Sequence, residues 1–217
     1  MHFSDTLCVW AYVSQIRIDE LLRHFSGSVE LEYRYLHVFG DVPKKMEASW
    51  KDRGGMRGYS EHVRTVCGQF GHVALDPGVW VRTTPQSSMP SHLFLCAVRL
   101  LESDGSAPPG ALSCAAWAVR EAFFKDGADV AQRETLLGIA EKIRLPVAEI
   151  QNILDTGSAH AALCGDLDLA RTHGIQASPT LLFNEGRQRL SGNVGYRIIE
   201  ANIRELIEGA PGQLSWC

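Results

Sequence analysis

Near the N-terminus the sequence reads Thr6-Leu7-Cys8-Val9-Trp10-Ala11-Tyr12, and this stretch decides how the rest of the chain is interpreted. The residues before it, His2 to Asp5, are typical of an extended segment. From Val9 to Phe25, apolar residues recur close to a helical period. Cys8 is therefore predicted at the N-terminus of a helix. Free amide N–H groups and the positive end of the helix dipole stabilise a thiolate there, so we expect an accessible thiol with a pKa below that of a free cysteine.

The overall composition limits the classes of protein to consider. A chain of 217 residues can form one sizeable domain or a domain with a large insertion. Its net charge of −4 provides no basic surface, so neither nucleic acid nor an anionic membrane is an expected partner. No early segment has the layout of a signal peptide, and no apolar run is long enough to span a bilayer. We expect a soluble, cytoplasmic protein.

The cysteines and histidines show no metal-binding pattern. No C-x-x-C pair is present, which argues against a disulfide framework and against a zinc site, so no metal is predicted. The six cysteines are Cys8, Cys67, Cys96, Cys114, Cys164 and Cys217. Seven histidines are predicted to be surface or capping residues without a catalytic role: His24, His37, His62, His72, His92, His160 and His173.

The first part of the chain predicts a βαβ unit. Strands are expected at Phe3 to Leu7 and at Glu30 to Phe39, and the helix between them requires a parallel pair. Residues 40–58 are rich in charge, Gly and Pro, and are predicted to be a long surface loop that could cover the helix start as a lid. Trp50 is expected to anchor this loop, and a substrate contact is the alternative. A short helix is predicted from Tyr59 to Phe70.

The middle of the chain predicts a helical insertion. Between Ser87 and His173, apolar residues recur at helical spacing in five segments that are separated by Pro and Gly, without a strand signal. A strand signal returns at Ile175 to Asn184, which includes Pro179 and is followed by a hairpin turn. A return strand at 188–191 and a last helix from Ile198 to Ile207, closed by Gly209, complete the pattern.

This element order and three motifs resemble the DsbA-like thioredoxin-fold oxidoreductases of the FrnE type, together with the 2-hydroxychromene-2-carboxylate isomerases and kappa-class glutathione transferases. Cys8-Val9-Trp10-Ala11 is similar to their C-P-W-C motif, Ser178-Pro179-Thr180 to their cis-proline motif, and Ser191-Gly192-Asn193 to the entry to their last helix. The resemblance implies an α/β, thioredoxin-like fold with a large all-helical insertion. Ala11 stands where the family has its resolving cysteine, so a two-cysteine cycle is not implied.

The resemblance also implies domain bounds and site residues. Residues 1–84 and 174–217 would form a discontinuous thioredoxin-like domain, with 85–173 as the helical insertion. A cis bond before Pro179 would turn the preceding backbone toward Cys8, where it can pair with a bound peptide or thiol; an ordinary edge-strand proline is the alternative. Cys8 is the expected catalytic residue, and the expected substrate-binding residues are Val9, Trp10, Ala11, Ser178, Pro179, Thr180 and Asn193.

Three functions remain open. The first is a thiol-disulfide oxidoreductase or isomerase in which Cys8 forms a mixed disulfide that an external thiol resolves. The second is a glutathione-dependent transferase or isomerase of the kappa or chromene-carboxylate type, although Asn193 stands where those relatives typically carry an acidic residue. The third is a non-catalytic binding module with a vestigial Cys8.

For all three, we expect no tightly bound cofactor. Glutathione is a candidate co-substrate, and the expected partner is a protein or small-molecule thiol or disulfide. The sequence leaves open a homodimer.

Overall fold

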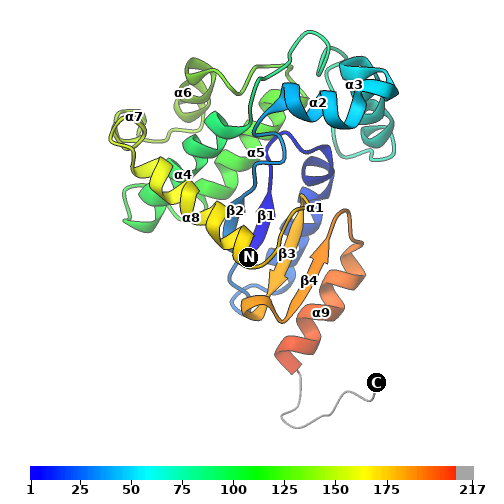
Figure 1. Cartoon of the computed structure of the whole chain (residues 1–217). Helices are drawn as coiled ribbons and strands as arrows, with labels where there is room; N and C mark the ends of the chain where they lie inside the picture. Colours follow the sequence, from blue (N-terminus) through cyan, green and yellow to red (C-terminus); the bar gives the residue numbers. More distant parts are fainter. Residues whose placement is uncertain (209–217) are drawn as a thin grey trace.

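The computed structural model describes residues 1–208. Within this part of the chain, a four-stranded sheet has the order β2-β1-β3-β4 (Figure 1). The strands are β1 (His2–Ser4), β2 (Tyr33–Tyr35), β3 (Thr180–Phe183) and β4 (Gln188–Ser191). β1 pairs in parallel with β2 and antiparallel with β3, which pairs antiparallel with β4. The residues before Cys8 are thus joined to a segment that lies near the other end of the chain.

Helices account for most of the remaining structure. They are α1 (Val9–His24), α2 (Val42–Trp50), α3 (Gly55–Cys67), α4 (Met89–Ser103), α5 (Ala111–Phe124), α6 (Arg133–Lys142), α7 (Val147–Asp155), α8 (Ser158–Thr172) and α9 (Tyr196–Glu208), with short 3-10 helices at Lys51–Arg53 and Asn184–Gly186. The five helices α4 to α8 pack on one another, and α8 contacts β2 (Figure 1). The predicted thioredoxin-like fold with a helical insertion is confirmed. The predicted helix end at Gly209, the residue Cys217 and the predicted domain end at 217 lie outside the described residues.

The first two strands are shorter than predicted. β1 ends at Ser4, not Leu7, because the carboxylate of Asp5 turns back to accept the amide N–H of Leu7 at 2.9 Å. β2 covers three residues instead of 30–39, since it can pair only with the three-residue β1 beside it. The sequence pattern predicts where a strand lies, but the number of residues that pair also depends on the length of the neighbouring strand.

The predicted loop over residues 40–58 is wrong, because this segment is mostly helical. Asp41 caps α2 by accepting the amide N–H of Lys44 at 3.0 Å, and a proline lies in the first turn. Met46 and Trp50 bury one face of α2, so Trp50 packs at the end of a helix and is not a loop anchor. α3 then runs from Gly55 to Cys67, about one turn earlier than the predicted helix.

One glycine fixes the corner between α2 and α3. A Cβ atom at Gly58 would lie 1.8 Å from the carbonyl oxygen of Arg53, so no larger residue fits there without moving the backbone. This corner places α2 and α3 beside the end of the sheet at which β1 terminates (Figure 1).

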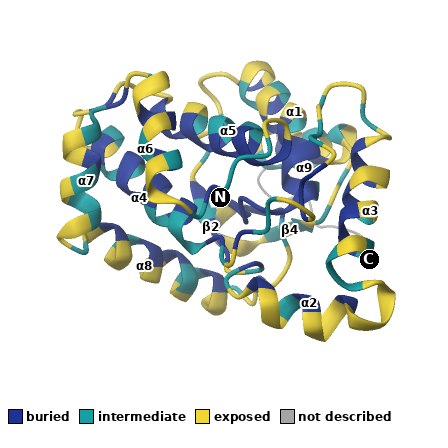
Figure 2. Cartoon of the chain, turned by 90° about the horizontal axis from the view of Figure 1, so that it is seen from above, coloured by how far each residue is buried: buried dark blue, intermediate teal, exposed yellow. Residues whose placement is uncertain are grey.

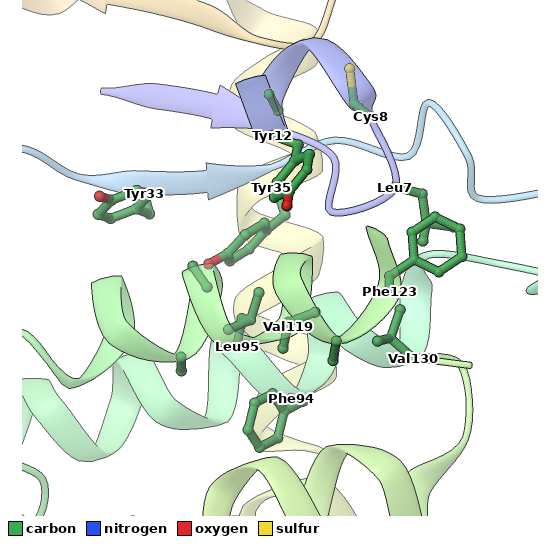
Figure 3. Packing of buried hydrophobic residues seen from close by; sticks show 14 of the residues in the cluster. Leu7, Cys8, Tyr12, Tyr33, Tyr35, Phe94, Leu95, Val119, Phe123 and Val130 are labelled. Carbon is green, nitrogen blue, oxygen red and sulfur yellow. The ribbon is translucent and has the colours of Figure 1, made fainter. Parts of the chain in front are cut away.

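The core is continuous from the sheet to the helical insertion. Figure 2 shows buried residues in the middle of the molecule and exposed residues on the outer faces of α2, α7 and α8. In Figure 3, the core side chains Phe94, Val119 and Phe123 pack between helices, whereas the Cys8 sulfur lies at the edge of the cluster and points away from them. The start of α1 therefore packs on the hydrophobic core.

Candidate active site

Cys8 occupies the residue before the first turn of α1. Its backbone is extended, with φ −82° and ψ 116°, and its carbonyl accepts the amide N–H of Tyr12 at 3.1 Å. Its own N–H donates to the carbonyl of Asp5 at 3.2 Å, which closes the turn between β1 and α1. The predicted placement of this thiol at a helix N-terminus is confirmed.

The segment before β3 folds directly against Cys8. The peptide bond between Ser178 and Pro179 is cis, the isomer expected from the sequence. The Cys8 Sγ–H donates to the carbonyl oxygen of Ser178 at 3.2 Å, and the Ser178 hydroxyl accepts the amide N–H of Asp5 at 2.9 Å. Two motifs that are 170 residues apart in sequence thus share one site.

The expected accessible thiol with a lowered pKa is wrong for this conformation. Cys8 is only 5% exposed, and this burial raises the pKa of its thiol. The Ser178 side chain and the backbone amides of Ala11 and Trp10 act in the opposite direction, and the nearby Asp5 carboxylate raises the pKa further. The helix start therefore does favour the thiolate, as predicted, but the loss of water around the sulfur outweighs it.

The Asp5 carboxyl group is completely buried three residues before Cys8. It accepts the amide N–H groups of Leu7 and Phe39 at 2.9 and 2.8 Å, and the hydroxyl of Ser88 at 2.9 Å. Burial raises the pKa of Asp5 to about 6, although these three hydrogen bonds each lower it. Asp5 therefore ties β1, the approach to α2 and the start of α4 to the site.

His92 is also fully buried, which corrects its prediction as a surface or capping residue. Its Nε2 accepts the amide N–H of Thr6 at 3.2 Å and lies 3.7 Å from Oδ1 of Asp5. Burial, followed by the charge of Arg120, lowers the pKa of His92 to about 3. His92 is thus neutral at physiological pH, and the short distance to Asp5 is not an ion pair.

An aromatic cluster from α1, α2 and α3 lies next to this site. The Trp10 ring meets the edge of His62 at 6.3 Å between ring centres, and the same His62 lies 5.3 Å from Trp50. Tyr59 packs edge-on against Trp50 at 5.0 Å and against Trp80 at 5.1 Å. The side of the site formed by α2 and α3 is thus aromatic.

The remaining predicted site residues differ in exposure. Val9 and Ala11 are buried and Trp10 is half-buried, so only Trp10 of these three presents a large surface. Pro179 is buried; so is Thr180, whose hydroxyl donates to the carbonyl of Ala177 at 2.8 Å. The buried residues among them pack beneath Cys8 and leave little surface for a ligand to contact.

Asn193 is exposed and accepts a hydrogen bond from the guanidinium of Arg17. Arg17 lies on α1, and its guanidinium carbon is 6.0 Å from the centre of the Phe70 ring. The position therefore has a basic neighbour and no acidic side chain of its own. It offers nothing that would hold the amino group of glutathione in the way the transferase relatives are expected to.

Sequence reasoning missed Asp5, Ser88 and His92, which form hydrogen bonds in and around the turn that leads into Cys8. Asp5 carried a usable signal, since it is an acidic residue at the end of a strand and immediately before the candidate thiol. Ser88 directly precedes α4 and His92 lies in its first turn, and only the three-dimensional packing of this helix brings them to the site.

Residues 1–208 contain neither a disulfide nor a cluster of metal ligands. The five cysteines in this part of the chain are all free, and Cys114 and Cys164 are exposed. No group of three or more His, Cys, Asp or Glu residues in this range could hold a metal ion. None of the helices described is both long enough and apolar enough to cross a membrane.

The chain is similar to known proteins over different lengths. The family model of the DSBA-like thioredoxin domain matches residues 1–204. The ClpXP adapter protein SpxH of Bacillus licheniformis is 32% identical over 98 residues, which cover 43% of this chain and only 33% of that protein.

Two solved structures share the fold at low sequence identity. A probable DsbA oxidoreductase from Streptomyces coelicolor is 18% identical with a TM-score of 0.73, covering 100% of this chain and 92% of that one. The cytosolic disulfide reductase DsbM from Pseudomonas aeruginosa, also solved with GSH, is 15% identical with a TM-score of 0.68, covering 94% and 97%. Since the family model spans nearly the whole chain, the protein belongs to the family of DSBA-like thioredoxin domains.

Proposed function

We propose that the protein is a thiol-disulfide oxidoreductase or isomerase that acts through Cys8 alone. The observation that carries this proposal is the position of the Cys8 sulfur, which lies at the N-terminus of α1 and 3.2 Å from the Ser178 carbonyl beside the cis-proline. A thiolate at this point gains hydrogen bonds from the amides of Trp10 and Ala11, and the backbone before Pro179 is a surface on which an extended substrate can pair.

The proposed reaction has two exchange steps. In the first, the Cys8 thiolate attacks one sulfur of a substrate disulfide, so that a mixed disulfide forms and the second substrate sulfur leaves as a thiolate. Ala11 supplies no second thiol, so an external thiolate attacks the mixed disulfide and releases Cys8 as a thiolate again. The external thiol leaves joined to the remaining substrate sulfur in a new disulfide. A second external thiol that cleaves this disulfide completes net reduction, so the two electrons come from two thiols that end as one disulfide; if the first sulfur and the external thiol both came from glutathione, that new disulfide is already oxidised glutathione.

Glutathione is the external thiol that we propose. The single cysteine suits reduction of glutathione mixed disulfides or disulfide shuffling, since neither requires an internal partner. The likeness in fold to a cytosolic disulfide reductase that was solved with GSH supports this choice. We place the reaction in a reducing compartment such as the cytoplasm, where glutathione is available.

Intact-mass measurement after incubation with oxidised glutathione tests the proposal. Because Cys114 and Cys164 are exposed, the protein to use carries serine at these two positions and at Cys217. We expect one glutathione adduct, mapped by peptide mass to Cys8 and absent after Cys8→Ser. An adduct on Cys67 or Cys96 instead, or no adduct, would overturn the proposal.

A non-catalytic binding module is the second candidate. The burial of Cys8 and its raised pKa favour this reading, because both reduce the fraction of reactive thiolate. The partial match to a protein that is named as an adapter points the same way. The glutathione experiment separates the two candidates, since a binding module predicts no adduct on Cys8.

A further inference from the structure

A groove between α8 and α2 is lined by residues other than those of the site around Cys8. We propose that this groove binds an extended, acidic segment of a protein substrate, next to the disulfide on which Cys8 acts. The inference rests on the proposed function and deepens it, because it names protein disulfides as the class of substrate.

The groove consists of two adjoining pockets of about 620 and 570 Å³. The first lies along α8 and includes Ile175 and Gln176, and the second lies along α2. Both are lined by His37, Val38 and Leu167, so the two pockets join at these residues. Figure 2 shows α8 and α2 along one edge of the molecule. The groove therefore crosses from the helical insertion to the thioredoxin-like part of the chain.

The first pocket leads toward the cis-proline segment. Gln176 precedes Ser178 by two residues, and two residues span at most about 7 Å. The Ser178 carbonyl in turn lies 3.2 Å from the Cys8 sulfur. A polypeptide whose disulfide is at Cys8 thus needs only a few further residues to enter the groove.

The segment after β2 offers main-chain donors to such a polypeptide. β2 is an edge strand, and α8 closes its edge where Asp166 accepts the amide N–H of Tyr35 at 3.2 Å. Within residues 1–208, the amide N–H groups of His37, Val38 and Gln176 donate no hydrogen bond. An extended peptide pairs with main-chain groups of this kind at the edge of a sheet. These donors favour a polypeptide over a small thiol.

The charges of the groove favour an acidic partner. Lys44 and Lys45 of α2 line the second pocket and take part in none of the ion pairs found within residues 1–208. The carboxylates of the groove are already engaged, since Asp168 pairs with Arg171 at 3.0 Å and Asp41 accepts the amide N–H of Lys44 at 3.0 Å. Two lysines without a counter-charge stand out on a chain whose net charge is −4. Glutamate or aspartate side chains complement them.

The groove also has an apolar part. Leu167, Val38 and Met89 are half-buried, so each presents apolar surface to the two pockets. In an extended peptide, alternate side chains point to opposite faces. A segment in which apolar residues alternate with acidic ones can therefore place one face on these side chains and the other toward the lysines.

The test measures binding of two short fluorescein-labelled peptides to the full chain by fluorescence anisotropy. In one, leucine alternates with glutamate beside a serine that replaces the substrate cysteine. In the other, lysine replaces each glutamate. Neither peptide contains a thiol, so binding is measured without disulfide exchange. We expect the glutamate peptide to bind about tenfold more tightly than the lysine peptide.

Charge reversal on α2 should invert this preference. Lys44→Glu combined with Lys45→Glu should weaken binding of the glutamate peptide about tenfold and strengthen that of the lysine peptide. Lys142→Glu combined with Arg197→Glu is the control, because these exposed positions on α6 and α9 change the net charge by the same amount outside the groove. Equal binding of the two peptides by the wild type, or an equal loss in both variants, overturns the inference.

Two exposed cysteines show where the peptide binds on the wild-type chain. Cys164 lines the first pocket, whereas Cys114 lies on α5 outside the groove. At a peptide concentration of about ten times Kd, about one chain in eleven is free, so alkylation of Cys164 by iodoacetamide should slow about tenfold. Alkylation of Cys114 should not change. Equal slowing at both cysteines, or slowing at neither, contradicts the proposed location.

Other occupants give different results in the same measurements. If reduced glutathione alone slows the alkylation of Cys164, the groove binds glutathione and the inference is wrong. It is also wrong if the chain sediments as a dimer that Lys44→Glu with Lys45→Glu dissociates, because the groove would then join two copies.

Failure of this inference is distinct from failure of the proposed function. Binding of the glutamate peptide without a glutathione adduct on Cys8 would retain the groove and reject the oxidoreductase. A glutathione adduct on Cys8 without peptide binding would do the reverse.

Discussion

His92 Nε2 lies 3.7 Å from Oδ1 of Asp5, at a point where neither side chain has any solvent-exposed surface. Because the Thr6 amide N–H donates to this nitrogen, the ring proton of the neutral histidine is on Nδ1, which has no partner among the described residues. The carboxyl group, in contrast, accepts three hydrogen bonds from Leu7, Phe39 and Ser88. Two adjacent titratable groups are thus held in environments that shift their pKa values in opposite directions.

The first prediction is that the protein loses stability as the pH falls toward 5. The pKa values of His2 and His92 are lowered to about 3, so only the unfolded chain binds protons on these two residues below 6.5. Asp5 acts in the opposite sense, since its pKa of about 6 lies above its ordinary value of 3.8 and the folded state holds this proton first. Below pH 6, unfolding therefore takes up two protons and releases one, so the free energy of unfolding should fall by about 1.4 kcal/mol per pH unit.

Urea unfolding at several pH values measures this slope. His2→Phe should nearly abolish it, because it removes one of the two histidines. It should also raise stability at low pH, since both ring nitrogens of His2 lack a partner. His160→Gln, at an exposed position, should leave the slope unchanged. A stability that is flat or rises between pH 6.5 and 5 in the wild type contradicts the prediction.

A second prediction concerns Arg120, whose guanidinium is completely buried and takes part in none of the ion pairs found within residues 1–208. It donates instead to the Ser4 hydroxyl at 2.8 Å and to Oε1 of Gln15 at 2.9 Å. Ser4→Ala should destabilise the protein by about 1.5–3 kcal/mol, because it removes an acceptor from a buried charge. Ser191→Ala is a control in β4, where the hydroxyl is exposed and accepts from Thr180, and should cost about 1 kcal/mol or less. If Ser4→Ala and Ser191→Ala lower the free energy of unfolding in denaturant by the same amount, the buried charge of Arg120 does not set the cost of losing the Ser4 hydroxyl.

Ala11→Cys should allow a disulfide with Cys8. The Ala11 amide already interacts with the Cys8 sulfur, so the two side chains start from neighbouring positions. Ala11 is fully buried, and the added sulfur should cost about 1–3 kcal/mol in the reduced state. Intact mass under oxidising conditions should show the loss of two hydrogens, and the variant should then cycle as a dithiol oxidoreductase. Ser14→Cys, almost two helical turns from Cys8, should form no such bond, and an equally oxidised Ser14→Cys variant would refute the argument.

Gly58→Ala should disrupt the corner between α2 and α3. The added Cβ would lie 1.8 Å from the Arg53 carbonyl, so α3 must shift or unwind at its start. We expect a loss of about 1–3 kcal/mol in thermal or urea unfolding, because the added Cβ must displace the backbone at this corner. Gly138→Ala on α6 is the control, because no atom lies within 4 Å of its added Cβ and alanine favours a helix. If Gly58→Ala and Gly138→Ala are equally stable, the close approach at Gly58 does not affect the free energy of unfolding.

The sequence predicted those features of the fold that depend on local periodicity and order. The start of α1 at Val9, the five helices of the insertion and the approach of Pro179 to Cys8 followed from patterns and from the resemblance. The helix over 42–50 was missed because charge, Gly and Pro were taken as loop signals, although Asp41 and Pro43 are also the residues that start a helix.

The state of the thiol could not be read from the sequence. A helix N-terminus is a local property, and it favours the thiolate of Cys8 as predicted. Desolvation depends on how closely other parts of the chain, the Ser178 segment among them, cover the sulfur, and these contacts join residues that are far apart in the chain. The burial of His92 depends on the same long-range packing.

The pairing of β1 with β3 has a consequence for synthesis on the ribosome. His2 and Phe3 pair with Leu181 and Thr180, so the second edge of β1 stays open until nearly the whole chain has been translated. The Ser178 carbonyl that accepts the hydrogen bond of the Cys8 thiol emerges at the same late stage. A nascent chain therefore carries Cys8 without its final cover until residues 178–181 have emerged, and its thiol is open to chance oxidation during that time.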